Sequence, residues 1–336
     1  MSKTQSPLER SEKSGAARPG FDFSVIMAFL GRYNIALIFV ALVIIASFVS
    51  DDFLTRRNIT NVLRQSAGVG ISAMGMLMVI STGGIDLSVG SVSACGSVLG
   101  AKFLSTMPVW GAVVTAILIG CAMGSVSGYV VAGRGMPPFV VTLGMMTIAR
   151  GTAFIVSKGQ PIPVGANGQL LNDFGKGLTF GIANPVILML VIFGITWFIL
   201  HYTAYGRLVT AIGSNQEAVH LSGISIGWYI FSVYVISGGL SALAGIVNTS
   251  RAGVGSPVLG IGMELDVIAA VVIGGASLMG GRGTAFNALL GVLILAVIGN
   301  IMNLKNVPGY HQEVVKGVII LVAVLLQSGI LSRRQS

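Results

Sequence analysis

Charged side chains are scarce in this chain. Asp, Glu, Lys and Arg together make up 9% of its 336 residues, whereas soluble domains carry roughly 25%. Hydrophobic residues make up 54%, and the mean hydropathy is +0.88. So few polar groups cannot cover the exterior of a fold surrounded by water. The composition therefore excludes an ordinary soluble globular domain.

Cysteine and histidine are also few. Cys95 and Cys121 lie inside apolar stretches without CxxC spacing, and the three histidines lie far apart, so we predict neither a metal site nor a disulfide framework. No nucleophile stands beside a base, and no Gly-x-x-x-x-Gly-Lys-[Ser/Thr] phosphate loop occurs. We therefore predict a protein that is not an enzyme and binds no cofactor, so that any ATP and Mg²⁺ belong to a separate subunit.

The net charge of +9 is spread singly or in pairs along loops and tails. Nucleic-acid binding proteins instead gather basic residues into a patch or stripe. We therefore predict no nucleic-acid partner, and we interpret the basic residues as topology signals and as contacts to lipid headgroups.

Long uncharged apolar stretches recur from residue 32 to residue 331. A helix needs about 20 apolar residues to cross a hydrocarbon core of about 30 Å, and the strict alternation typical of barrel strands is absent. We predict an all-α, polytopic integral membrane protein with one transmembrane domain, residues 32–331, and two tails, residues 1–31 and 332–336. Its roughly ten transmembrane helices are expected near residues 33–50, 61–82, 87–106, 109–131, 137–157, 184–201, 226–248, 265–280, 284–302 and 312–331.

An even number of spans places both termini on one side of the membrane. Basic residues are enriched in cytoplasmic segments, and the tails carry Lys3, Arg10, Lys13, Arg18, Arg32, Arg333 and Arg334. We therefore expect both termini to be cytoplasmic. Residues 158–183 then form a long outer loop and residues 202–225 a long inner loop, and both are natural docking surfaces.

Three glycines recur at every fourth position in the predicted fourth span: Gly120, Gly124 and Gly128. This small-xxx-small pattern lines one helical face and allows a second helix to approach closely in lipid. We interpret it as a helix-packing face within the chain, and the alternative is a seam between two copies.

The segment Gly83-Gly84-Ile85-Asp86-Leu87-Ser88 interrupts two apolar stretches. Asp86 is suited to accept hydrogen bonds from the free N–H groups that open the next helix. The alternative is that the break lines a substrate path, because irregular backbone at membrane depth persists only beside protein or a water-filled cavity. Both interpretations are compatible.

In the inner loop, Ser214-Asn215-Gln216-Glu217 fits the capping box Ser-x-x-Glu, and Gly223 provides a stop. The sequence therefore predicts a short helix. Isolated helices of fewer than about 12 residues are marginal in water, so docking onto a partner would explain this one. The alternative is a linker helix on the membrane surface.

Two carboxylates, Glu264 and Asp266, open the predicted eighth span. Acidic side chains stabilise the positive end of a helix dipole, and a position at the outer mouth of a sugar path is the second interpretation. Arg150, near the predicted outer end of the fifth span, is expected to reach the headgroups.

Four motifs in order resemble permeases of ribose-type ABC sugar importers. They are GGIDLSVGS (83–91), AIGSNQEAVHLSGI (211–224), ELDVIAAVVIGGASLMGG (264–281) and residues 315–325, within a resemblance that covers about residues 35–330. The resemblance implies the ABC importer permease fold and a translocation break at Gly83, Gly84, Asp86 and Ser88. It also implies an ATPase-coupling segment at Gly213, Ser214, Glu217, Ser222 and Gly223, in which Ser214 replaces the glycine frequent in the family.

The same resemblance implies three protein partners: a cytoplasmic ABC ATPase, a periplasmic sugar-binding protein and a second permease copy in a homodimer or heterodimer. We therefore expect a binding-protein-dependent permease of the bacterial inner membrane that imports a ribose-like pentose or a hexose. The main alternative is an ion-coupled secondary transporter of a small polar solute, which the scarcity of charged residues within the spans disfavours. A channel and a lipid-modifying enzyme lack the filter motif and the clustered His, Asp or Glu that each would need.

Overall fold

The computed structural model describes residues 34–332, with side chains up to residue 325. The predicted N-terminal tail, residues 1–31, and residues 333–336 lie outside the described residues. The elements in chain order are α2 (Asn34–Val49), α3 (Arg56–Ser81), α4 (Val89–Phe103), α5 (Val109–Arg134), α6 (Pro138–Ser157), β1 (Ile162–Pro163), η1 (Ala166–Gly168), α7 (Gln169–Lys176), β2 (Leu178–Thr179), β3 (Ile182–Ala183), α8 (Asn184–Tyr202), α9 (Ala204–Ser214), α10 (Gln216–Leu221), α11 (Ile226–Ala252), β4 (Val254–Gly255), α12 (Met263–Ile273), α13 (Ala285–Leu304) and α14 (Gly309–Ser332).

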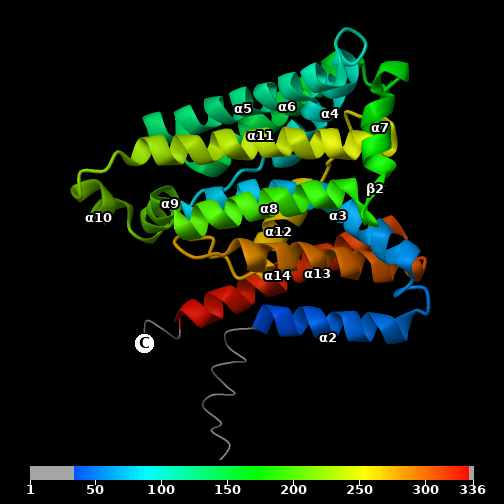
Figure 1. Cartoon of the computed structure of the whole chain (residues 1–336). Coiled ribbons are helices and arrows are strands. Elements are labelled where there is room, and N and C mark those ends of the chain that lie inside the picture. The colour runs from blue at the N-terminus through cyan, green and yellow to red at the C-terminus, as the bar shows by residue number, and fades with distance from the viewer. Residues whose placement is uncertain (1–33, 333–336) are drawn as a thin grey trace, which may run out of the picture.

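Most long helices run roughly parallel in one bundle (Figure 1). α5, α6 and α11 form one side, α3 and α8 the middle, and α12, α13 and α14 the other side, with α2 at the edge. The short helices α9 and α10 lie at one end of the bundle and α7 at the opposite end. We call these ends the α10 end and the α7 end.

Six helices are long and apolar enough to cross a membrane: α3, α5, α6, α8, α11 and α13. The fold is thus an all-helical, multi-pass membrane fold. A helix lies at each of the ten expected positions, but α2, α4 and α12 have only 16, 15 and 11 residues. At 1.5 Å per residue, α12 is about 16 Å long, about half the thickness of the hydrocarbon core. The described structure therefore supports six candidate spans, and the expected count of about ten is not confirmed.

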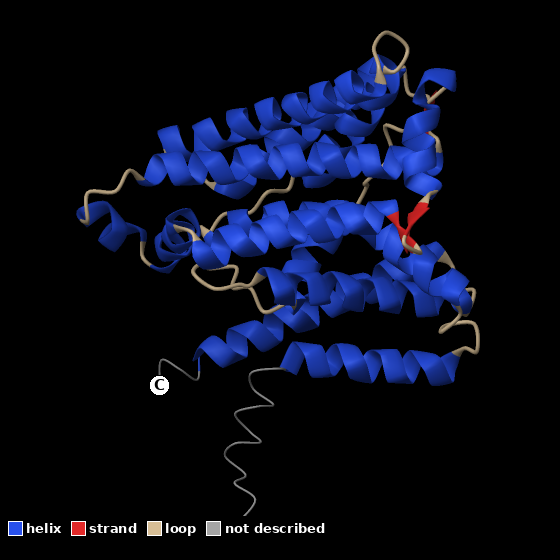
Figure 2. Ribbon diagram, in the orientation of Figure 1, coloured by secondary structure: helices blue, strands red, loops and turns tan. Residues whose placement is uncertain are grey.

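Strand structure in the described residues consists of two short antiparallel pairs, β1 with β4 and β2 with β3. The red strands in Figure 2 lie at the α7 end. The β1–β4 pair joins the loop after α6 to the segment after α11. The loop of residues 158–183 is therefore ordered, with its own helix α7, which the sequence analysis did not predict.

The core lies along α3 and α11. In α3 every residue from Ser66 to Ser81 is buried except Val69, and α11 packs against α3, α4 and α5. α5 approaches α11 through its small residues. A Cβ on Gly120 would lie 2.5 Å from the carbonyl oxygen of Gly238, and one on Gly128 would lie 2.7 Å from that of Phe231. The structure thus places the glycine face of α5, including Gly124, against α11 of the same chain.

Candidate functional site

Asp86 is buried at the break between α3 and α4, with 2% of its surface exposed. Its Oδ1 accepts hydrogen bonds from the Ser88 backbone N–H (3.0 Å) and the Ser88 hydroxyl (2.6 Å). Its Oδ2 accepts one from the Ser237 hydroxyl on α11 (2.7 Å). Because Ser88 is the residue before α4, the carboxylate stabilises the start of that helix as well as the contact with α11.

The break lies inside the helix bundle and not at its surface. Ser237 is near the middle of α11, and the hydroxyl of the fully buried Tyr234 lies against Gly84. Gly83, two residues after the end of α3, has a φ of +83°, a conformation that favours glycine. In this conformation Asp86 and Ser88 are enclosed by protein, so neither faces an open path.

α4 and α12 begin beside each other. A Cβ on Gly90 would meet the carbonyl oxygen of Gly260 and the carboxylate of Glu264. Arg150 lies close by: its Nη1 donates to the carbonyl oxygens of Pro257 and Leu259, both at 2.7 Å. The expectation that Arg150 reaches the headgroups is therefore wrong, because its guanidinium orders the irregular segment before α12.

Glu264 and Asp266 both lie in the first turn of α12, but their surroundings differ. Glu264 Oε2 is buried without a hydrogen-bond partner in the described residues. Asp266 accepts a hydrogen bond from Lys316 on α14 at 3.1 Å and lines a cavity. The structure thus separates the pair, and only Asp266 lines that open space.

Three backbone segments meet at the α10 end of α3. The Gly281 N–H donates to the Ser81 carbonyl oxygen at 3.1 Å. Gly213, near the end of α9, fits against the same carbonyl, and its Cα would lie 2.8 Å from a Cβ on Gly280. Gly280 has a φ of +87°. We call this contact of residues 81–83, 213–214 and 280–281 the glycine junction.

α9 and α10 form the expected short helical segment of the loop 202–225, but its cap differs from the prediction. Ser214 is the last residue of α9, and its hydroxyl donates back to Thr210. Asn215 is the N-cap of α10, accepting from the Ala218 N–H at 3.0 Å. The capping-box assignment of Ser214 is therefore wrong by one residue, because the end of α9 occupies that position.

α10 has little cover from its own chain. Val219 is its one buried residue, whereas Glu217 is exposed and 80% of Leu221 is exposed. Ser222 and Gly223 follow in an exposed turn, in which Gly223 has a φ of +78°. By contrast α9 is held firmly: the Tyr205 hydroxyl and Ser232 of α11 share a hydrogen bond of 2.6 Å, and burial raises the pKa of that hydroxyl.

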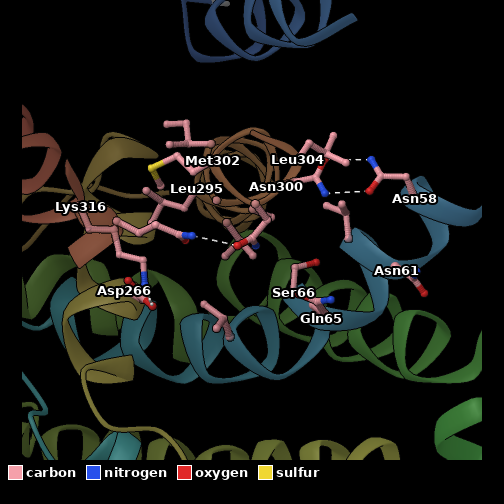
Figure 3. A pocket seen from close by; sticks show the side chains of 18 residues that line it. Asn58, Asn61, Gln65, Ser66, Asp266, Leu295, Asn300, Met302, Leu304 and Lys316 are labelled. Carbon is pink, nitrogen blue, oxygen red and sulfur yellow. Dashed lines mark hydrogen bonds and ion pairs between the residues drawn. The ribbon is translucent and has the colours of Figure 1, made fainter. Parts of the chain in front are cut away.

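A cavity of about 410 Å³ lies between α3, α13 and α14, with Asp266 of α12 at its base (Figure 3). It extends from the α7 end, where Asn58 and Leu304 line it, to the Asp266–Lys316 ion pair. Figure 3 shows Asn58 and Asn300 joined by two hydrogen bonds, at 2.9 and 2.8 Å. No group of three His, Cys, Asp or Glu suited to a metal ion occurs among residues 34–332.

This cavity was not predicted from the sequence. A signal was present, because Asn58, Asn61 and Gln65 recur at spacings of three and four in the polar first turns of a helix that is apolar further on. The other wall comes from residues about 240 positions later in the chain, and no local pattern brings those two walls together.

The family model described as "Branched-chain amino acid transport system / permease component" matches residues 58–324. The chain belongs to this permease family. Permeases of the family are similar to this chain over nearly their whole length. Ribose import permease protein RbsC of Haemophilus influenzae is 41% identical over 293 residues, which are 85% of this chain and 91% of that protein.

Further permeases are similar to this chain over comparable lengths. RbsC of Bacillus subtilis is 43% identical, covering 85% of this chain and 89% of that protein. D-allose transport system permease protein AlsC of Escherichia coli is 35% identical, covering 94% and 97%. No solved structure matches the chain.

Proposed function

We propose that this chain is the membrane-spanning subunit of an ATP-driven ABC importer that carries a monosaccharide into the cytoplasm. The observation that carries the proposal is the similarity, along most of both chains, to permeases named for ribose and allose transport. The chain moves the sugar without altering it, and a partner ATPase binds ATP and Mg²⁺. About ten spans in the bacterial inner membrane, with both termini cytoplasmic, complete the proposed topology.

The exposed α10 is the proposed docking site for the ATPase. Its exposed Glu217 and Leu221 offer a charge and an apolar side chain to a partner, while the glycine junction joins the preceding α9 to the end of α3. Movement of α9 would therefore be transmitted to Gly83 and to the break that holds Asp86. The ordered loop 158–183 at the opposite end is the proposed contact for a periplasmic binding protein, and a second permease copy completes the pore.

Uptake by cells that express the complete transporter tests this function. Radiolabelled D-ribose, D-allose and L-arabinose are offered in parallel with L-leucine, because the family description names branched-chain amino acids. We expect uptake of at least one sugar that stops when ATP is depleted and continues when the proton gradient is collapsed. Leucine uptake alone would refute the substrate class, and uptake that depends on the proton gradient would favour the ion-coupled alternative.

A further inference from the structure

Amide side chains make up six of the 18 residues that line the cavity between α3, α13 and α14. They are Asn58, Asn61, Gln65, Asn300, Asn303 and Gln312. Each amide group carries both donors and acceptors, and a sugar hydroxyl also donates and accepts. The volume of about 410 Å³ lies within the range of roughly 300–1,000 Å³ of small-molecule sites.

Four of these amides are already paired with each other. Asn58 and Asn300 bond reciprocally, and Gln312 donates to Asn303 at 2.9 Å and to the Val307 carbonyl at 2.8 Å. These bonds hold the ends of α3, α13 and α14 together at the α7 end. The pairs thus form the frame of the cavity rather than its free hydrogen-bonding groups.

Asn61 and Gln65 are different. They lie four residues apart, on one face of α3, both are exposed, and neither side chain has a hydrogen bond to any described residue. α3 is a candidate span, in which residues 66–81 are buried except Val69, whereas none of residues 56–65 is buried. An amide that faces lipid without a partner costs free energy, so this face of α3 is suited to water or a polar solute.

The charged side chains at the base of the cavity indicate which class of solute it suits. Lys316 is paired with Asp266 at 3.1 Å and with Glu313 at 3.2 Å. An amino acid would need a free cation and a free anion for its own two charges, but the one cation and the one carboxylate of the lining bind each other. The lining therefore suits an uncharged solute with many hydroxyl groups.

We propose that this cavity is a sugar subsite of the translocation path, in which Asn61 and Gln65 form hydrogen bonds with sugar hydroxyls. The proposal rests on the proposed function and adds to it the residues that hold the sugar within the membrane. The Asp266–Lys316 ion pair closes the inner end of the subsite. A sugar delivered at the α7 end would meet the two free amides before it reaches that pair.

The test uses the complete transporter, permease with its ATPase and binding protein, in proteoliposomes. Asn61→Leu and Gln65→Met approximately keep the side-chain length but remove the amide hydrogen-bonding groups. Loss of one hydrogen bond is expected to lower the rate of ribose, allose or arabinose uptake about tenfold at saturating sugar. ATP hydrolysis by the same complex should persist, so that fewer sugars are moved per ATP. A purely structural defect would lower both rates together.

Thr147→Val is the matched control, because it removes one exposed polar group at similar side-chain size, on α6, outside the cavity and outside both proposed docking surfaces. We expect this variant to transport like the wild type. If wild-type complexes import sugar and the Asn61 and Gln65 variants do so at the same rate, the subsite is refuted while the proposed function stands. If wild-type complexes import no sugar, the proposed function itself fails.

Thiol labelling gives a second readout that does not depend on transport rate. Gln65→Cys is made in a chain in which Cys121 is replaced by Ser, leaving Cys95, which is buried. A membrane-impermeant maleimide should label Cys at position 65, and D-ribose, D-allose or L-arabinose, whichever is imported, should slow labelling at least threefold. Labelling that the imported sugar leaves unchanged would contradict the proposed subsite.

Discussion

Replacement of Gly213 by Ala perturbs the glycine junction at its tightest point. A Cβ at this position would lie 2.5 Å from the Gly281 nitrogen and 2.9 Å from the Ser81 carbonyl carbon, where ordinary contacts measure 3.4–4 Å. All of these neighbours are backbone atoms, which no side-chain rotation can move away. α9 must therefore shift by about 1 Å relative to the end of α3.

Overpacking of this kind costs about 1–3 kcal/mol, and Ala regains at most about 1 kcal/mol over Gly within a helix. With the middle of that range, about 2 kcal/mol, the balance is about 1 kcal/mol against the conformation described here, which corresponds to a factor of about 5 in an equilibrium. If the junction links the ATPase contact to the Asp86 break, ATP-driven sugar uptake should fall by a similar factor. Membrane insertion should persist, since no span is altered.

Uptake by vesicles with equal amounts of permease measures this effect. Gly194→Ala is the control, because Gly194 is a helical glycine of α8 with no atom within 4 Å of its added Cβ. We expect this control to transport like the wild type. If Gly213→Ala also transported like the wild type, the inference that the junction couples the two regions would be refuted.

Three further predictions concern other parts of the site. Glu217→Arg should abolish uptake while the protein still fractionates with membranes, because it reverses an exposed charge on the proposed ATPase contact; normal uptake would refute the coupling role. Asp86→Ala removes the acceptor of three hydrogen bonds and should lower the free energy of unfolding of the detergent-solubilised protein by about 3–5 kcal/mol, with a smaller loss for Asp86→Asn. Equal thermal midpoints for the wild type and Asp86→Ala would contradict this. Gly120→Ala adds a Cβ that would overlap with α11 and should lower the thermal midpoint, whereas Gly144→Ala, which has open space around its added Cβ, should not. Similar midpoints for the two variants would count against the close contact of α5 and α11.

The positions of the long helices were predictable because apolar length, glycine, proline and charge mark where a chain leaves lipid. The number of spans was not confirmed, because α4 and α12 have apolar sequences but are only about 22 and 16 Å long, shorter than the hydrocarbon core of about 30 Å. Their short length depends on the irregular segments before them, which Asp86 and Arg150 hold through residues far away in the chain. The local sequence pattern of α4 and α12 gives no indication of those distant contacts.

The candidate site was predicted in part. The break at Asp86 and the short helix after Ser214 were predictable from the sequence, since glycine pairs and capping residues act locally. The predicted cap was wrong by one residue, and the cavity was not predicted. The difference is physical: a cap involves neighbours within one turn, whereas the cavity exists because Asn58 on α3 and Asn300 on α13 meet across the fold.

Accumulation of sugar by sealed proteoliposomes tests the central claim most directly. The purified permease is reconstituted with its ATPase and binding protein, ATP is supplied on the ATPase side, and radiolabelled D-ribose, D-allose or L-arabinose on the other. We expect at least one of these sugars to accumulate above its external concentration, chemically unaltered, only with ATP and with all three components. Equal accumulation without ATP, or by the permease alone, would contradict it.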